Sequence, residues 1–392
     1  MKLLAANVGS LVSYPGRDVK VWSDIYRLFS MNISLVDRAG IVTMPFRFEP
    51  YKKFMLPVDL DGFTATYEDC CNRRAQELLE LQDRQGVPIA LFYSGGIDST
   101  LVLISFAKIL GAEIKNRVKV FLSVDSIKEN PNFYYRFIRK NCDIESSEKF
   151  PYLFDGSHII VGAEHNDQLF GSDLVNKIAR LTSFEEVKRP YSRKFVTGVF
   201  RLRGMQKLAA NAWFDVISEH ARRAPCPVET VFDLFWWLNF VFKWQSVYFR
   251  MVLHINKELH GNIDQRFLDT FYNHFFSTVE FQKWAMVNRD LKIGDSWRSY
   301  KFQAKELIYE FNKDRDYLEN KIKQGSLFRL FLERSMAAAL TTDYELLFEL
   351  RPQELYNSAN SFVGVSRKAP ARATSRRGAR RPAADLEAAG RP

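Results

Sequence analysis

The sequence predicts an α/β fold, in which a parallel sheet covered by helices is followed by a mainly helical C-terminal part. Apolar runs of strand length alternate with helical segments between residues 87 and 165, as expected for parallel strands joined by crossover helices. Two of these runs lead into loops rich in glycine or acidic residues. Ligands of open α/β sheets bind at the carboxyl ends of strands, so the two loops are the candidate site.

The elements expected between residues 67 and 162 alternate between helix and strand. In order they are helix 67–82, strand 87–93, helix 100–107, strand 118–124, helix 132–140 and strand 159–162. From Gly171 to about Leu347 the pattern is mainly helical. Residues 232–249 are strongly aromatic, but Asp233, Asn239 and Lys243 interrupt the run. We therefore expect a buried helix there and no membrane span.

The loop after the first strand reads Ser-Gly-Gly-Ile-Asp-Ser over residues 94–99. Gly95 and Gly96 let the backbone approach an anion, and the first turn of the following helix adds N–H donors and a positive dipole end. Ser94 and Ser99 add hydroxyl groups. A carboxylate at Asp98 would repel phosphate unless a cation lay between them, which implies Mg²⁺. The Gly-Lys-Ser/Thr of a Walker loop is missing from this motif.

This loop resembles the pyrophosphate loop of the ATP pyrophosphatases, the PP-loop enzymes that cut ATP to AMP and pyrophosphate. The family includes asparagine synthetase, GMP synthetase, NAD synthetase and several tRNA-modifying enzymes. The resemblance implies a PP-loop core of the adenine nucleotide alpha hydrolase-like type and ATP as the bound nucleotide. By family position, the backbone near Leu91, Val124 and Ala163 would contact adenine.

A second motif follows the strand at 159–162 and is similar to the asparagine synthetase signature Gly-Glu-Gly-Ser-Asp-Glu-Leu-Phe-Gly-Gly. The matching positions are Glu164, Asp167, Leu169, Phe170 and Gly171. The resemblance implies that Asp167 joins Asp98 in holding Mg²⁺, and that Glu164 lies at the substrate and adenylate site.

The second motif also departs from the family signature at four positions. His165 and Asn166 replace Gly and Ser, Gln168 replaces the second acid, and Ser172 replaces Gly. These differences concern the acceptor chemistry more than the ATP site. The loop also resembles the His-x-x-Asp-Asp-Gln loop of tRNA lysidine synthetases.

A third segment, residues 300–307, resembles the Lys-x-x-x-Arg-Glu helix of the same family. The resemblance implies that Lys301 contacts phosphate and stabilises the transition state, with Lys305 at the position usually occupied by arginine. Residues 276–285 resemble the family's Pro-Phe-Leu-Asp segment without its proline. On these residues alone, an amphipathic helix with solvated lysines explains the segment as well.

Composition divides the chain into regions. It has 392 residues, 46% of them hydrophobic, and a net charge of +10. Residues 366–392 carry eight basic and two acidic residues, so +6 of this charge lies there and only +4 in the body. We expect a small N-terminal region at 1–86, an asparagine synthetase-like domain at 87–347, a linker at 348–365 and a disordered basic tail at 366–392. Nucleic acid is then an expected partner only through the tail.

The four cysteines show no Cys-x-x-Cys and no zinc spacing, which favours a reducing, cytoplasmic location. Glutamine-dependent asparagine synthetases begin with a cysteine after Met1 and carry a glutaminase domain. Here residue 2 is Lys2, and fewer than ninety residues precede the loop. The nitrogen is therefore expected to come from ammonia, from an amine substrate or from a separate amine donor protein.

Together these features predict an ATP-dependent carbon–nitrogen ligase that forms AMP and pyrophosphate. It would adenylate a small carboxylate substrate and transfer the acyl group to ammonia or an amine. Two alternatives remain open at this point. One is a nucleotide- or tRNA-modifying PP-loop enzyme that adenylates a base carbonyl, and the other is a non-catalytic descendant that only binds nucleotide.

Overall fold

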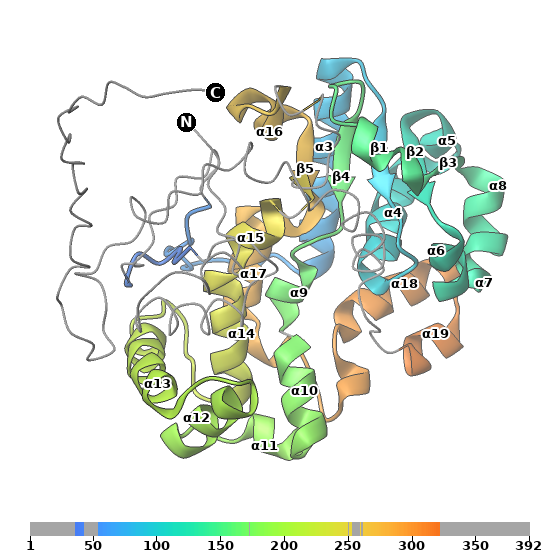
Figure 1. Cartoon of the computed structure of the whole chain (residues 1–392). Coiled ribbons are helices and arrows are strands. Elements are labelled where there is room, and N and C mark those ends of the chain that lie inside the picture. Colours follow the sequence, from blue (N-terminus) through green and yellow to red (C-terminus); the bar gives the residue numbers. More distant parts are fainter. Residues whose placement is uncertain are drawn as a thin grey trace, which may run out of the picture.

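The computed structural model describes residues 36–42, 54–171, 173–249, 251–252, 259 and 262–321. Its described strands form one five-stranded, all-parallel sheet in the order β3-β2-β1-β4-β5 (Figure 1). The strands are β1 (Ile89–Phe92), β2 (Val118–Leu122), β3 (Asp143–Ser146), β4 (Ile159–Gly162) and β5 (Tyr272–His274). The prediction of an α/β fold with a parallel sheet is confirmed.

The central strands are buried on both faces. In β1, Ile89 and Leu91 pack into one apolar cluster and Ala90 into another, because successive side chains of a strand point to opposite faces. In β4, Ile159 and Val161 share the first cluster, while Ile160 lies in the second. This double burial explains why the two strands read as uninterrupted apolar runs.

Helices α3 (Tyr67–Gln85), α4 (Ile97–Leu110) and α18 (Phe302–Asn312) pack against one another on the first face. Helix α3 begins at a reciprocal cap, in which the side chains of Thr66 and Asp69 each accept a hydrogen bond from the other's main chain, and ends at Gly86 in the left-handed conformation. The two caps satisfy main-chain groups at both ends of α3, and Tyr67 is the first residue of this helix.

The second face is covered mainly by aromatic side chains from η3 (Ser147–Tyr152), α15 (Trp244–Phe249) and α16 (Gln265–Thr270). The connections around β2 and β3 are short helical segments: η1 (Gly111–Glu113), α5 (Ile114–Arg117), α6 (Val124–Glu129), α7 (Pro131–Phe133), η2 (Tyr134–Ile138) and α8 (Arg139–Asn141).

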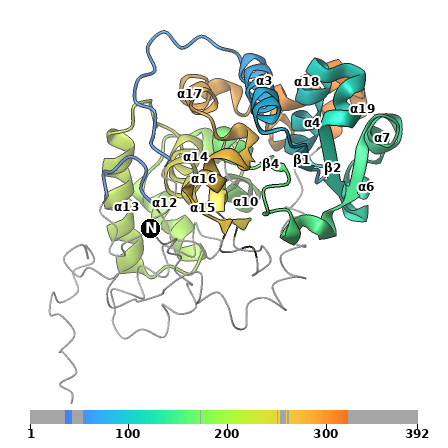
Figure 2. The same cartoon turned by 90° about the horizontal axis from the view of Figure 1, so that it is seen from above.

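A helical unit lies beside the sheet (Figures 1 and 2). It consists of α9 (Asn166–Phe170), α10 (Asp173–Leu181), α11 (Phe184–Lys188), α12 (Arg193–Leu202), α13 (Lys207–Arg222) and α14 (Val231–Phe242). Every residue of α14 is buried. The remaining C-terminal elements are η6 (Phe275–Ser277), α17 (Val279–Val287), η7 (Arg289–Leu291), η8 (Trp297–Ser299) and α19 (Arg315–Asn320).

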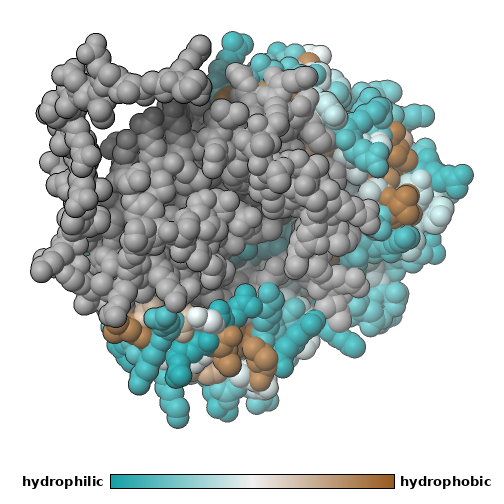
Figure 3. Space-filling model, in the orientation of Figure 1, coloured by the Kyte–Doolittle hydropathy of each residue, from teal (hydrophilic) through white to brown (hydrophobic). Residues whose placement is uncertain are grey.

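The aromatic run is buried from residue 232 to residue 248 except at Lys243, as predicted, but it forms two helices, α14 and α15, with a break at Lys243. In the part of the chain that the structure describes, no helix is long and apolar enough to cross a membrane. On the face drawn in Figure 3, the exposed apolar side chains form small separate spots among hydrophilic residues.

The structure differs from the predicted elements in three places. Strands β3 and β5 were not predicted, because Asp-Ile-Glu-Ser and Tyr-Asn-His are too short and too polar to read as strands. Val124 was expected to end the second strand, but it begins α6. Residues 1–35, 322–347, the expected linker at 348–365 and the expected tail at 366–392 lie outside the described residues.

Candidate functional site

The candidate site lies where the order of the sheet reverses. The chain leaves β1 to build β2 and β3 on one side, and later adds β4 and β5 on the other. The loops after β1 and β4 therefore begin at neighbouring strand ends on either side of this reversal, the position at which ligands of open α/β sheets bind. These are the loops that carry the first two sequence motifs.

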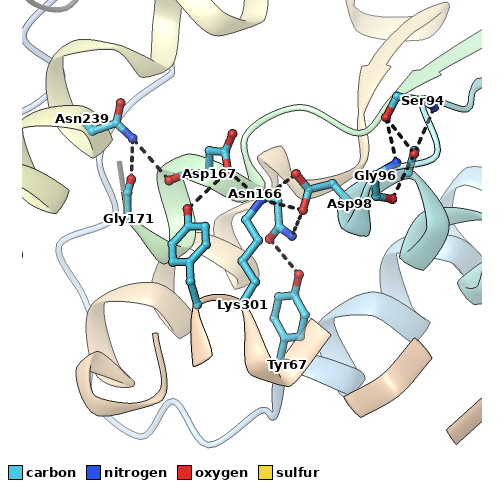
Figure 4. Close-up of polar contacts among 11 residues, drawn as sticks. Tyr67, Ser94, Gly96, Asp98, Asn166, Asp167, Gly171, Asn239 and Lys301 are labelled. Atoms are coloured by element: carbon cyan, nitrogen blue, oxygen red, sulfur yellow. Dashed lines mark hydrogen bonds and ion pairs between the residues drawn. The ribbon is translucent and has the colours of Figure 1, made fainter. Parts of the chain in front are cut away.

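The loop at 94–99 is closed by its own serines (Figure 4). The Ser94 N–H donates to Ser99 Oγ over 3.1 Å, the two serine Oγ atoms lie 3.0 Å apart, and the Gly96 N–H donates to Ser94 Oγ over 3.3 Å. Gly95 has φ +76°, and a Cβ there would lie 2.3 Å from the Ser126 carbonyl oxygen. Only glycine fits at this position, because a side chain would collide with α6.

The loop leads directly into α4. Gly96 is the N-cap of α4, and no side chain caps this helix end by a hydrogen bond. The first-turn N–H groups have no partners within the helix, and the dipole of a 14-residue helix adds partial positive charge there. The arrangement suits a phosphate group.

Lys301 joins residues from both loops. Its Nζ lies 2.6 Å from Asp98 Oδ2, 2.7 Å from Asp98 Oδ1 and 2.6 Å from Asp167 Oδ1 (Figure 4). The Lys301 side chain is 1% exposed, whereas those of Asp98 and Asp167 are 23% and 31% exposed. The lysine is thus covered, while both carboxylates reach solvent. The alternative of a solvated surface lysine at 301 is excluded.

The paired carboxylates fit the donor set of a magnesium site. Mg²⁺ in nucleotide enzymes is held by one or two carboxylates, with phosphate and water oxygens completing the octahedron. Asp98 and Asp167 can supply those two carboxylates. In the described part of the chain, no cluster of three or more His, Cys, Asp or Glu side chains could hold a metal by itself. A metal here would therefore depend on ligands from a bound phosphate.

Lys301 owes its position to an unusual backbone. The residue has φ 57° and ψ 34°, in the left-handed region, and serves as the N-cap of α18. Its N–H donates to the Lys292 carbonyl over 3.4 Å, and Tyr300 stacks on Trp297 with ring centroids 4.4 Å apart. The predicted helix therefore begins one residue after Lys301. The lysine projects from the turn before the helix.

Lys305 lies one turn further along and makes different contacts. Its Nζ donates to the Arg298 carbonyl over 2.5 Å and lies 3.5 Å from the Lys321 carbonyl oxygen. Burial lowers the pKa of its ammonium group. Through these contacts Lys305 connects two main-chain segments, at Arg298 and Lys321.

Asp167 is fixed through both its side chain and its main chain. The Tyr300 hydroxyl lies 3.3 Å from Asp167 Oδ1. Asn239 Nδ2, from α14, donates to the carbonyls of Asp167 and Gly171 over 3.3 and 2.7 Å. Helix α9 has only five residues, and these contacts tie it to the buried helix α14.

Sequence reasoning missed a hydrogen-bonded chain behind Asp98. The Tyr67 hydroxyl donates to Asn166 Oδ1 over 2.7 Å, and Asn166 Nδ2 donates to Asp98 Oδ1 over 2.6 Å. The neighbouring His165 is buried, with φ 76°, and its Nε2 lies 3.1 Å from the Trp244 carbonyl. Asn166 was visible in the sequence only as a departure from the family motif, and nothing local singled out Tyr67.

The other predicted site residues lie around the same edge of the sheet. Leu91 is fully buried in β1, so only its backbone can face a ligand. Val124, the first residue of α6, is 67% exposed although it is apolar. Ala163 and Glu164 are half-buried in the loop between β4 and α9.

No protein-family model matches the chain, and no match was found among curated proteins or solved structures. The case for a function therefore rests on the motif residues and on the way the fold assembles them.

Proposed function

We propose that the chain is an ATP-dependent ligase of the asparagine synthetase type, built on a PP-loop core. The observation that carries the proposal is the contact of Lys301 with both Asp98 and Asp167. These three residues come from three separate motifs, each of which resembles a segment of the same family. If the resemblances were due to chance, these three residues would not be expected to lie together at the point where the strand order of a parallel sheet reverses.

The reaction has two steps. A carboxylate oxygen of the substrate attacks the α-phosphorus of ATP, the bond between this phosphorus and the bridging oxygen breaks, and pyrophosphate leaves. The nitrogen of ammonia or of an amine then attacks the acyl carbon, and AMP leaves with the electron pair of its bond to that carbon. The products are an amide, AMP and pyrophosphate.

Each motif has a role in these steps. The loop at 94–99 and the first turn of α4 bind the departing pyrophosphate through N–H and hydroxyl groups. Lys301 places fixed positive charge beside it, where charge develops in the transition state. Mg²⁺ held by Asp98 and Asp167 would neutralise charge on the phosphates. Glu164 orients the acceptor or takes the proton that the amine loses.

The exposed Val124 and the backbone of Leu91 and Ala163 lie at the carboxyl ends of β2, β1 and β4. An apolar side chain left exposed at this edge suits an adenine ring, which would cover it. These positions are our proposed adenine contacts. The substrates are then ATP, a small carboxylate and ammonia or an amine, which a separate protein can deliver.

ATP–pyrophosphate exchange tests the proposal. Labelled pyrophosphate should enter ATP only when Mg²⁺ and a suitable carboxylic acid are present, and a screen over amino acids and small carboxylates should find that acid. Exchange that requires RNA instead would favour an enzyme that adenylates a base carbonyl. ATP binding without exchange under any condition would favour a non-catalytic descendant.

A further inference from the structure

We propose that Tyr67 and Asn166 are positioning residues that hold the Asp98 carboxylate in the orientation required for nucleotide-bound metal. The inference rests on the proposed function and deepens it, because it assigns to the same site two residues to which the family motifs give no role. Tyr67 lies at the start of α3, about thirty residues before the pyrophosphate loop, and the fold brings it to Asp98 through a single intervening side chain.

The direction of both hydrogen bonds follows from the chemistry of the groups. An ionised Asp98 only accepts hydrogen bonds, so the NH₂ group of Asn166 must face it. The carbonyl oxygen of the same amide then faces Tyr67, whose hydroxyl must donate. Burial raises the pKa of Tyr67 well above its usual value, which keeps the proton on the phenol. In this series of hydrogen bonds from Tyr67 to Asp98, the donor and the acceptor of each bond are therefore fixed.

Tyr67 and Asn166 are both buried, and the Tyr67 ring is packed among other aromatic rings. Tyr67 is 2% exposed and Asn166 is fully buried. The Tyr67 ring packs against the aromatic rings of Phe170, Phe276, Phe281 and Trp284, with centroids 4.7 to 6.4 Å away. A phenol fixed in this way sets the position of the amide, which in turn sets the carboxylate.

Both oxygens of Asp98 accept hydrogen bonds from these side chains. Asn166 and Lys301 both donate to Oδ1, and Lys301 also donates to Oδ2 (Figure 4). The second donor at Oδ1 fixes the rotation of the carboxylate about its Cβ–Cγ bond. Groups that orient a metal ligand typically change metal affinity or activity by about 10- to 100-fold when they are removed.

The test compares Tyr67→Phe with a matched control, Tyr248→Phe. Tyr248 is also buried, and its hydroxyl lies 3.0 Å from the Leu268 carbonyl oxygen on the other face of the sheet. The affinity of each protein for MnATP is measured by water proton relaxation enhancement, and each melting temperature is recorded. Tyr67→Phe should weaken MnATP binding about 10-fold. Tyr248→Phe should leave the binding unchanged, although both variants lose some thermal stability.

A double-variant cycle separates positioning from simple loss of packing. In an Asn166→Leu background, Tyr67→Phe should have no further effect on MnATP affinity, because the phenol acts only through the amide. Equal MnATP affinities for the wild type and Tyr67→Phe would overturn the positioning proposal alone. Equal losses of MnATP affinity in Tyr67→Phe and Tyr248→Phe would also overturn it, because the weaker binding would then result from the general loss of thermal stability. A wild-type chain that does not bind MnATP would overturn the proposed function itself.

Discussion

Two buried lysines, Lys292 and Lys301, lie nine residues apart and have opposite surroundings. Lys301 Nζ contacts two carboxylates that reach solvent. Lys292 Nζ has no hydrogen-bond partner among the described residues and lies 3.0 Å from the centroid of the Trp236 ring. Burial lowers the pKa of Lys292 to about 7, although the indole face attracts a cation. The main chain links the two, because the Lys301 N–H donates to the Lys292 carbonyl.

The difference shows what burial does to a lysine with and without carboxylates in direct contact. At Lys301 two aspartates contact the ammonium group and compensate its charge. At Lys292 desolvation outweighs the attraction of Asp233 and Asp290, and the pKa of the amine falls. Under the proposed function, the charge at Lys301 would stabilise the negative charge that develops on a phosphate. Lys292 contributes packing beneath Trp236, whose Nε1–H donates to the Gln168 carbonyl in α9.

The largest effect is expected from removing the counter-charges of Lys301. Asp98→Asn and Asp167→Asn should each slow pyrophosphate release by ~10³-fold or more, because the metal-bridged charge is lost in the transition state. Each single variant should still fold, since Lys301 keeps the other carboxylate. Steady-state pyrophosphate release and circular dichroism measure the two effects.

The double variant Asp98→Asn/Asp167→Asn would place Lys301 in surroundings more like those of Lys292. Its loss in free energy of unfolding should exceed the sum of the two single losses, because an uncompensated buried charge remains. Strict additivity in urea denaturation would show that Lys301 does not depend on these carboxylates.

Sequence alone could predict the part of the site that is encoded locally. The apolar runs at β1 and β4 and the loops that follow them are continuous in the chain, so Asp98 and Asp167 could be placed at neighbouring strand ends. Tyr67, Asn239 and Tyr300 could not be placed, because their roles depend on contacts between distant segments. The two lysines show the same limit. The resemblance singled out Lys301, but nothing local showed that Lys301 is buried against two carboxylates or that Lys292 is buried at all.

Lys292→Met should change stability without changing the rate. The unfolded chain holds the Lys292 proton up to its ordinary pKa of 10.5, whereas the folded chain releases it at about 7. Between pH 7 and 9 the unfolded state therefore binds more protons, and the free energy of unfolding of the wild type rises with pH. The variant lacks this contribution, so it should be more stable than the wild type at pH 6, and the difference should shrink toward pH 9.

Urea denaturation of both proteins across this pH range measures the difference. Cys226, a neighbour of Lys292, has its pKa raised by burial to about 11 and stays protonated in the folded state throughout the window. A stability difference that does not vary with pH would contradict a lowered pKa for Lys292.

Only a small effect on the rate is expected at Lys305. Lys305→Met removes its hydrogen bond to the Arg298 carbonyl, so it should lower the free energy of unfolding by about 1–2 kcal/mol. Turnover should stay within about threefold of the wild type, because the described contacts of Lys305 do not include the carboxylates. A loss of turnover as large as that expected for Lys301→Ala would show that the catalytic lysine lies one turn further along the helix.

The most direct test of the central claim compares Lys301→Ala with Lys292→Met in ATP–pyrophosphate exchange, using the carboxylic acid that the wild-type screen identifies. Lys301→Ala should reduce the exchange rate about 10²- to 10³-fold, with a much smaller change in ATP affinity, and Lys301→Arg should restore little of it. Lys292→Met should exchange at the wild-type rate. Normal exchange by Lys301→Ala, or equal losses in both variants, would contradict a catalytic role for the lysine that joins Asp98 to Asp167.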